Sequence, residues 1–224
     1  MGTLKEKAVL GVKWSTIGNF TTQGVNFIVG LILARILVPS DYGVIGMVGI
    51  FFAIAQTFID SGFTSALIRK KDCSNIDYST AFYFNIVVAF ICSIILSISS
   101  SFIASFFVIP LLKDLVKVMS INMFIGSFSI VPSVILSSNM DFRSHAKISF
   151  MSSLVSGVVG IAMAHSGFGV WSLIYQNLTL TLLRVIYSYL VTKWRPQLIF
   201  SKVVCRYLCG FGSKILMSSL LHTI

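Results

Sequence analysis

Long uncharged and mostly apolar runs alternate with short charged segments along the chain. A membrane-spanning helix needs about 20 consecutive apolar residues with few or no charges. The runs therefore predict six spanning helices, over residues 14–34, 42–59, 80–104, 118–140, 148–164 and 170–191. A seventh is predicted to begin near residue 205 and is cut off at Ile224. The pattern indicates an all-α polytopic membrane protein with six transmembrane helices and the start of another.

The composition supports a membrane location. Hydrophobic residues make up 56% of the 224 residues and charged residues 11%, and the mean hydropathy is +0.92. Soluble proteins carry about 25% charged residues, so this chain has too little charge to solvate a globular surface. The net charge of +10 would suit nucleic acid only if it formed a patch on a soluble face. The basic residues instead lie between apolar runs, and we expect no nucleic-acid partner.

The basic residues also predict the orientation of the helices, because Lys and Arg concentrate in cytoplasmic loops. With the N-terminus in the cytoplasm, the outer loops hold only Arg35, Lys113 and Lys117. The inner segments hold the remaining loop cations: Lys5, Lys7, Lys13, Arg69, Lys70, Lys71, Arg143, Lys147, Lys193, Arg195, Lys202 and Arg206. The predicted topology therefore explains the net charge, although contact of these loops with anionic lipid headgroups is a further reading.

Three local signals predict breaks between or within the helices. The sequence "VPSDYG" (38–43) is a hairpin signal, in which Pro39 ends the first helix and Ser40 or Asp41 caps the second. The sequence "HSGFG" (165–169) predicts a turn between the fifth and sixth helices. Pro132 frees one backbone carbonyl in the fourth helix and is expected to bend it.

Small residues at helical spacing predict packing seams, because they let the backbones of membrane helices approach closely. Two helices carry such a series, and we interpret both as packing features rather than functional ones. The second helix has Gly43, Gly46, Gly49 and Ala53, and the fifth has Ser153, Gly157, Gly160 and Ala164.

Polar residues form a stripe along the first predicted helix. Ser15, Asn19, Thr22 and Asn26 recur at steps of four, three and four, with Thr16 and Gln23 beside them. One reading is hydrogen bonding between helices, at about 0.6 kcal/mol per contact. The other is a face that lines a water-filled cavity, which the number of polar groups favours.

A second polar stripe lies on the sixth predicted helix, formed by Asn177, Thr181, Arg184 and Ser188. Arg184 is nine residues from Lys193, about 13 Å along a helix. An arginine that snorkels to the inner boundary is one reading, since burial at the helix centre costs about 2.5–3.5 kcal/mol. The polar stripe favours a second reading, in which Arg184 faces a cavity that accepts an anionic substrate.

The residue types needed for catalysis do not occur at catalytic spacing. The sequence shows no paired carboxylates, Ser/His/Asp set, metal-ligand cluster or phosphate-binding glycine loop. We therefore expect neither an enzyme nor a bound metal or cofactor.

Several motifs together resemble a known family. The stretch "LARILVPSDYGVIGMV" (33–48) is similar to the first-hairpin signature of Wzx-type polysaccharide flippases, in the multidrug/oligosaccharidyl-lipid/polysaccharide exporter superfamily. The chain most resembles the branch that contains colanic acid exporters. Three further regions agree in order and spacing: "FIDSGFTSALIRKKD" (58–72) with "STAFYFNI" (79–86), "NMDFRSHAKIS" (139–149) and "GFGVWSLI" (167–174).

The resemblance implies a transport function. Such proteins move an undecaprenyl-diphosphate-linked oligosaccharide, a repeat unit of lipopolysaccharide O-antigen, capsule or exopolysaccharide, across the bacterial inner membrane by alternating access. Two six-helix halves flank their central cavity, whose cations meet the diphosphate and acidic sugars. Arg35, Arg69 and Arg143 become candidates because they lie in the shared motifs, although they also suit hairpin geometry or topology. Polysaccharide polymerase and chain-length machinery are implied partners.

The chain differs from that family in length, because members are about twice as long. We expect residues 1–200 to form the N-terminal six-helix lobe and residues 201–224 to begin the second. The chain is then either a fragment or a unit of which two copies assemble. Two other functions stay open: a cation-coupled multidrug exporter of the same superfamily, and a non-transporting membrane partner or inactive remnant.

Overall fold

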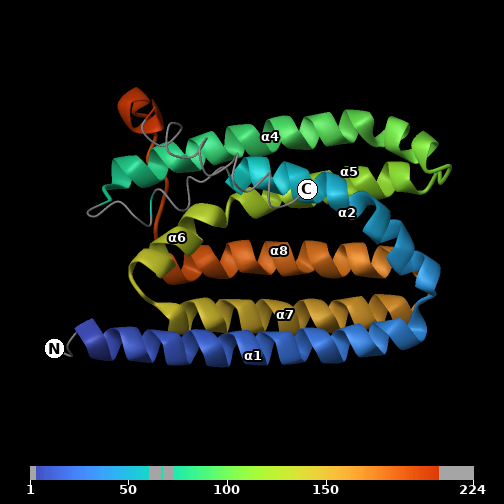
Figure 1. The fold of residues 1–224 in the computed structure, drawn as a ribbon, viewed down its shortest axis with the longest axis horizontal. Helices are drawn as coiled ribbons and strands as arrows, with labels where there is room; N and C mark the ends of the chain where they lie inside the picture. The colour runs from blue at the N-terminus through green and yellow to red at the C-terminus, as the bar shows by residue number, and fades with distance from the viewer. Residues whose placement is uncertain (1–3, 61–66, 68–72, 207–224) are drawn as a thin grey trace. The chain divides into compact units, whose positions relative to one another are not determined.

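The computed structural model describes residues 4–60, 67 and 73–206 (Figure 1). Its described helices are α1 (Leu4–Ile36), α2 (Pro39–Asp60), α4 (Asn75–Phe106), α5 (Leu112–Ser127), α6 (Ile130–Ser138), α7 (Phe142–His165) and α8 (Trp171–Thr192). Five stretches are long and apolar enough to cross a membrane: Lys13–Ile36, Pro39–Ile59, Asn75–Phe106, Leu112–Ser138 and Phe142–His165. The predicted all-α polytopic class is confirmed. Five of the six predicted spans correspond to these stretches, whereas the sixth, over residues 170–191, forms the helix α8 but is not among them. Most of the predicted seventh span lies outside the described residues.

Several helices are longer than the apolar runs that predicted them. α4 begins at Asn75 rather than near residue 80, because a capping box starts it there. The hydroxyl of Ser74 accepts a hydrogen bond from the backbone N–H of Asp77, whose carboxylate accepts one from the backbone N–H of Ser74. Such reciprocal bonds satisfy donors that a helix start leaves unpaired. The apolar run therefore marks the membrane-spanning part of α4, and the cap marks its beginning.

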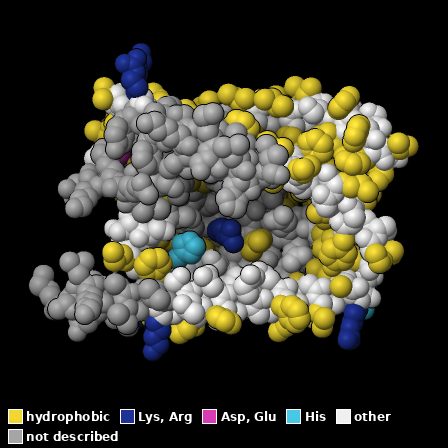
Figure 2. Space-filling model, in the orientation of Figure 1, with side chains coloured by type: hydrophobic (Ala, Val, Ile, Leu, Met, Phe, Trp, Pro, Cys, Tyr) yellow, Lys and Arg dark blue, Asp and Glu magenta, His cyan; other side chains and the backbone are white. Residues whose placement is uncertain are grey.

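The chain divides into two compact units. Unit 1 contains Met1–Ile45 and Ile135–Lys193, and therefore all of α1, α7 and α8. Unit 2 contains Gly46–Val134 and Trp194–Ile224, and therefore all of α4 and α5. Exposed large apolar side chains occur in both units, for example Phe20 and Ile98, and Figure 2 shows hydrophobic side chains over much of the visible surface. This surface suits a bilayer rather than water.

In unit 1, α7 packs between α1 and α8 (Figure 1). A Cβ added to Gly157 would lie 2.5 Å from a methyl group of Val29 on α1. On the neighbouring face of α7, a Cβ at Gly160 would lie 3.0 Å from Gln176 on α8. A side chain at either position would force its neighbour to shift, so the predicted packing seam on α7 is confirmed.

The predicted seam on α2 has no packing partner among the described residues. A Cβ added to Gly43, Gly46 or Gly49 would meet no atom within 4 Å in the described part of the chain. The buried residues of α2 are Val48, Ala55 and Ile59, which lie on the opposite side of the helix. The spacing of small residues shows only that another helix could approach this face of α2 closely. The face that is buried is the one that carries Val48, Ala55 and Ile59.

In unit 2, α4 and α5 pack as an antiparallel pair. The hydroxyl of Ser93 donates a hydrogen bond to the carbonyl of Ser120, at 2.8 Å. Aromatic rings meet edge to face along the pair: Phe90 with Phe124 at 5.7 Å, and Phe82 with Phe128 at 5.9 Å between centroids. Edge-to-face pairs of this kind add to the stability that burial provides.

The helix break expected from Pro132 is present. α5 ends at Ser127, and α6 begins at Ile130. In a continuous helix the carbonyl of Phe128, four residues before the proline, would accept a hydrogen bond from residue 132. Pro132 has no N–H to donate, and its ring would crowd that carbonyl. The break therefore falls where the missing N–H predicts it.

The two predicted turns are also helix boundaries. Gly167 and Gly169 have positive φ angles of 83° and 55°, a conformation that glycine adopts without steric cost. At the other turn α2 begins at Pro39 itself, so Ser40 and Asp41 lie inside the first helical turn. The prediction that one of them precedes and caps α2 is therefore wrong. Pro39 suits the first position because its missing N–H would be unpaired there in any case.

Candidate functional site

The helix register in unit 1 places Arg184 at the depth of the polar stripe on α1. Two contacts show that α1 and α7 run parallel: Asn26 with Ser153, and Val29 with Gly157. The partners differ in number by 127 and 128, and a nearly constant difference means that both helices run in the same direction. α8 runs antiparallel to α7, with Gln176 opposite Gly160. Because all helices rise equally per residue, Arg184 lies level with residue 152 of α7 and with residue 24 of α1.

The α1 stripe divides between the helix interface and the exposed surface. Asn26 accepts a hydrogen bond from the hydroxyl of Ser153 on α7 through its side-chain oxygen, so at this position the interhelical reading is confirmed. Thr22 is half-buried, and its hydroxyl oxygen is buried without a hydrogen-bond partner in the described structure. Asn19 and Gln23 are exposed on the flank of the same helix. These two amides are available to a ligand.

The α8 stripe is exposed or half-buried over its first three residues and buried at the last. Asn177 and Arg184 are exposed, Thr181 is half-buried, and Ser188 is buried. In the described part of the chain no carboxylate forms an ion pair with Arg184. A guanidinium at this depth without a carboxylate partner is costly in a bilayer unless it faces water or an anion.

His145 on α7 lies within range of the charge of Arg184, and our sequence analysis did not identify it. Its side chain is exposed. The residue stands within the motif "NMDFRSHAKIS", but the motif alone does not show that it faces α8. Together the two side chains offer several N–H donors to an oxyanion.

The other predicted arginines lie apart from Arg184. The guanidinium of Arg143 stacks over the ring of Trp14 on α1, 5.1 Å from the ring centroid, which supports a structural role. By the register above, Arg143 lies about 14 Å and Arg35 about 16 Å from the level of Arg184 along the helix axis. Arg69 is outside the described residues. The structure therefore does not bring these arginines into one cluster.

The side chains near Arg184 are suited to binding an oxyanion. Arg184 and His145 donate hydrogen bonds to oxyanions, and the exposed amides of Asn19, Gln23 and Asn177 donate or accept them. No group of three or more His, Cys, Asp or Glu residues that could hold a metal ion occurs within the described ranges. Such a set suits a ligand that combines phosphate or carboxylate groups with hydroxyl groups.

Comparison with known proteins identifies relatives across nearly the whole chain. The chain is 28% identical over 200 residues to the succinoglycan biosynthesis transport protein ExoT of Rhizobium meliloti, covering 89% of this chain and 40% of that protein. It is 22% identical over 227 residues to the lipopolysaccharide biosynthesis protein WzxC of Escherichia coli, covering 98% and 45%. It is 24% identical over 229 residues to the teichuronic acid biosynthesis protein TuaB of Bacillus subtilis, covering 100% and 47%.

The chain thus spans less than half the length of these three relatives. No solved structure shows a significant match to it. The family model described as polysaccharide biosynthesis protein matches residues 32–224, which include the first-hairpin motif and every later motif noted above. The chain belongs to this polysaccharide biosynthesis protein family, the Wzx-type family that its motifs resemble.

Proposed function

We propose that this chain forms one wall of a transport cavity for lipid-linked oligosaccharides in the bacterial inner membrane. Its substrate is an undecaprenyl-diphosphate-linked repeat unit, moved from the cytoplasmic to the outer leaflet by alternating access. The N-terminus lies in the cytoplasm, and α8 is the sixth span of the lobe. The relatives named above support transport of a bacterial polysaccharide precursor, and the second wall comes from another lobe or a second copy of the chain.

Arg184 carries this proposal. It is an exposed cation without a carboxylate partner in the described structure, level with the exposed amides of α1, and its charge reaches His145. A diphosphate matches the guanidinium, because planar N–H donors bind phosphate oxygens in pairs. The amides suit the hydroxyl groups of the sugars. Arg143 has a ring partner of its own and is better suited to holding α7 against α1.

The positions of the acidic residues favour this function over cation-coupled drug export. A coupling site for H⁺ or Na⁺ calls for a carboxylate in the middle of a span. Asp41, Asp77 and Asp114 lie in the first turns of their helices, and Asp141 is the residue that caps α7. Within the described spans, no Asp or Glu lies near the middle.

The test uses bacterial cells that lack their own flippase. The chain is expressed alone and fused to the C-terminal half of a full-length relative, and lipid-linked oligosaccharide that reaches the outer leaflet is measured. We expect transport from at least one of the two forms. In that form, Arg184→Ala should lower transport about 10- to 100-fold, the effect of losing a charged hydrogen bond of about 1.5–3 kcal/mol. Arg184→Lys should keep a fraction of the activity.

Arg195→Ala is the matched control, because Arg195 is also exposed but lies beyond the end of α8. It should transport normally. Equal loss of membrane-inserted protein in Arg184→Ala and Arg184→Lys would make Arg184 a structural residue. Transport from neither form would contradict the proposed function itself.

A further inference from the structure

The motif "STAFYFNI" (79–86) has no part in the oxyanion site described above. It lies in the first turns of α4, where Ser79 and Thr80 are buried. Their hydroxyl oxygens accept hydrogen bonds from the backbone of the segment that follows α8. The N–H of Gln197 donates to Ser79 at 3.1 Å, and the N–H of Ser201 donates to Thr80 at 3.2 Å. All four residues belong to unit 2.

The segment that makes these bonds, residues 194–201, is called the strap below. Lys193 ends α8 in the left-handed conformation, with a φ angle of 51°, and the chain is not helical again before residue 202. Pro196 favours this, because a proline disfavours helical backbone at the residue before it. A backbone outside a helix must find other partners for its N–H groups. The buried hydroxyls of α4 supply two of them.

An aromatic contact holds the beginning of the strap. The ring of Trp194 meets the ring of Phe82 edge to face, with 5.6 Å between centroids, and both side chains are buried. At the other end of the strap, the hydroxyl of Thr80 donates its own proton to the carbonyl of Ile76 at 2.7 Å. Its lone pairs are then available to the N–H of Ser201. The strap is therefore held to α4 at both of its ends.

We propose that Ser79 and Thr80 form a docking site for the strap, and that the strap fixes the chain after residue 201 to α4 rather than to α8. The division between the two units falls between Lys193 and Trp194, so the strap belongs to the unit of α4 although it follows α8 in sequence. The chain becomes helical directly after Ser201, and this helix keeps its place on α4 when α8 moves. The inference does not require the transport function.

The first test is amide hydrogen exchange of the full chain in phospholipid vesicles, resolved to single residues by mass spectrometry. Ser79→Ala should speed exchange at the N–H of Gln197 about fivefold, as the loss of a hydrogen bond of about 1 kcal/mol would. Thr80→Val keeps the side-chain shape and should have the same effect at Ser201, whereas Thr80→Ser keeps the hydroxyl and should have none. Ser105→Ala is the matched control, because that hydroxyl is exposed and donates to a carbonyl of its own helix.

The second test asks which helix the chain after the strap follows. Spin labels are attached to ketone-bearing amino acids at Lys202 and Asn75, or at Lys202 and Leu190, all of which are exposed. Electron paramagnetic resonance in the same vesicles should give a narrower distance distribution to Asn75 on α4 than to Leu190 on α8. Combining Ser79→Ala with Thr80→Val should broaden it.

Two results would overturn the proposal. One is exchange at Ser201 that is equal in Thr80→Val and Thr80→Ser. The other is a distance distribution that is narrower to Leu190 than to Asn75. Neither result bears on transport, so the proposed function would stand.

Discussion

Unit 1 and unit 2 hold their helices together with different side chains. In unit 1, glycines bring α1, α7 and α8 close, and a hydrogen bond joins Asn26 to Ser153. In unit 2, α4 and α5 meet through aromatic rings such as Phe82 and Phe128. Since lipid tails are as apolar as leucine, membrane helices associate through close fit and hydrogen bonds. Both units achieve that fit, one with small residues and one with large ones.

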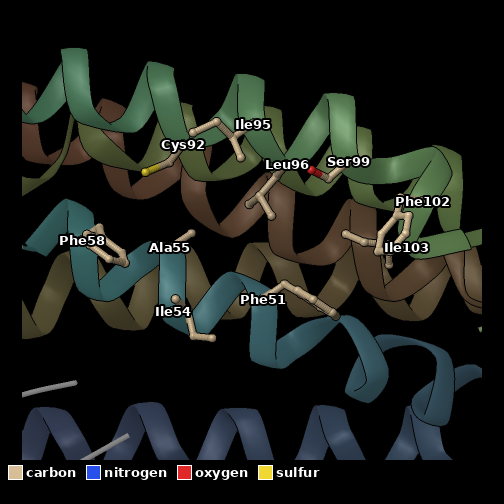
Figure 3. A pocket seen from close by; sticks show the side chains of 10 residues that line it. All are labelled: Phe51, Ile54, Ala55, Phe58, Cys92, Ile95, Leu96, Ser99, Phe102 and Ile103. Carbon is tan, nitrogen blue, oxygen red and sulfur yellow. The ribbon is translucent and has the colours of Figure 1, made fainter. Parts of the chain in front are cut away.

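The two modes of packing determine which kind of surface each unit leaves exposed. Close backbone contact in unit 1 needs little side-chain volume, so the flanks of α1 and α8 can carry exposed amides and Arg184. Packing by large side chains in unit 2 leaves space wherever a small residue interrupts it, as Ala55 does between the phenylalanines of α2. An open cavity of about 360 Å³ lies there between α2 and α4 (Figure 3). A polar face and an apolar cavity follow from these two modes of packing.

The largest effect on stability is expected from truncating the aromatic contacts of unit 2. Phe82 is 4% exposed, and its ring meets those of Phe128 and Trp194. Phe82→Ala should lower the free energy of unfolding by about 3 kcal/mol, because it leaves a cavity. Reversible unfolding in detergent micelles measures the change. The control Phe20→Ala removes a ring that is 78% exposed and should cost less than about 0.5 kcal/mol. Equal losses of stability in the two variants would mean that the buried ring of Phe82 contributes no more than the exposed ring of Phe20.

A smaller effect is expected from adding one methyl group to the glycine contact of unit 1. A Cβ at Gly18 would collide with the Cβ of Ala146 and lie 3.2 Å from its Cα, which cannot rotate away. Gly18→Ala should therefore lower the free energy of unfolding by about 1–3 kcal/mol. Gly46→Ala is the matched change at an open position and should stabilise by about 0.4–1 kcal/mol. If both variants changed the free energy of unfolding in the same direction, the packing described for α1 and α7 would be contradicted.

The smallest effect is expected from the interhelical hydrogen bond. Ser153→Ala should cost about 0.6 kcal/mol, the typical value for a polar contact between membrane helices. Ser156→Ala serves as control, because the hydroxyl of Ser156 donates to a carbonyl of its own helix. A double-mutant cycle with Asn26→Ala isolates the coupling. Coupling near zero would mean that this hydrogen bond contributes nothing to the association of α1 with α7.

The sequence predicted those features that local chemistry determines. Charge spacing located the helices, Pro132 located the break between α5 and α6, and Gly157 and Gly160 identified a packing face on α7. Each signal acts within a few residues along the chain. The domain boundary near residue 200 stays a prediction.

Features that depend on distant partners could not be predicted. The glycine series on α2 looked like the series on α7 but has no close neighbour among the described residues, because spacing does not specify a partner. The charge of Arg184 reaches His145 only because α7 and α8 pair in one register. The stacking of Arg143 on Trp14 likewise needs the parallel pairing of α1 with α7. A single sequence does not reveal such pairings.

The parallel pairing of α1 with α7 has a consequence for how the protein is made. The hydrogen bond from Ser153 to Asn26 joins residues 127 positions apart. At synthesis rates of about 5–20 residues per second, about 6 to 25 seconds pass between the emergence of one partner and that of the other. During this interval the amides of α1 lack their partner helix. The contact between α1 and α7 therefore forms late in synthesis, after most of the chain between them has been made.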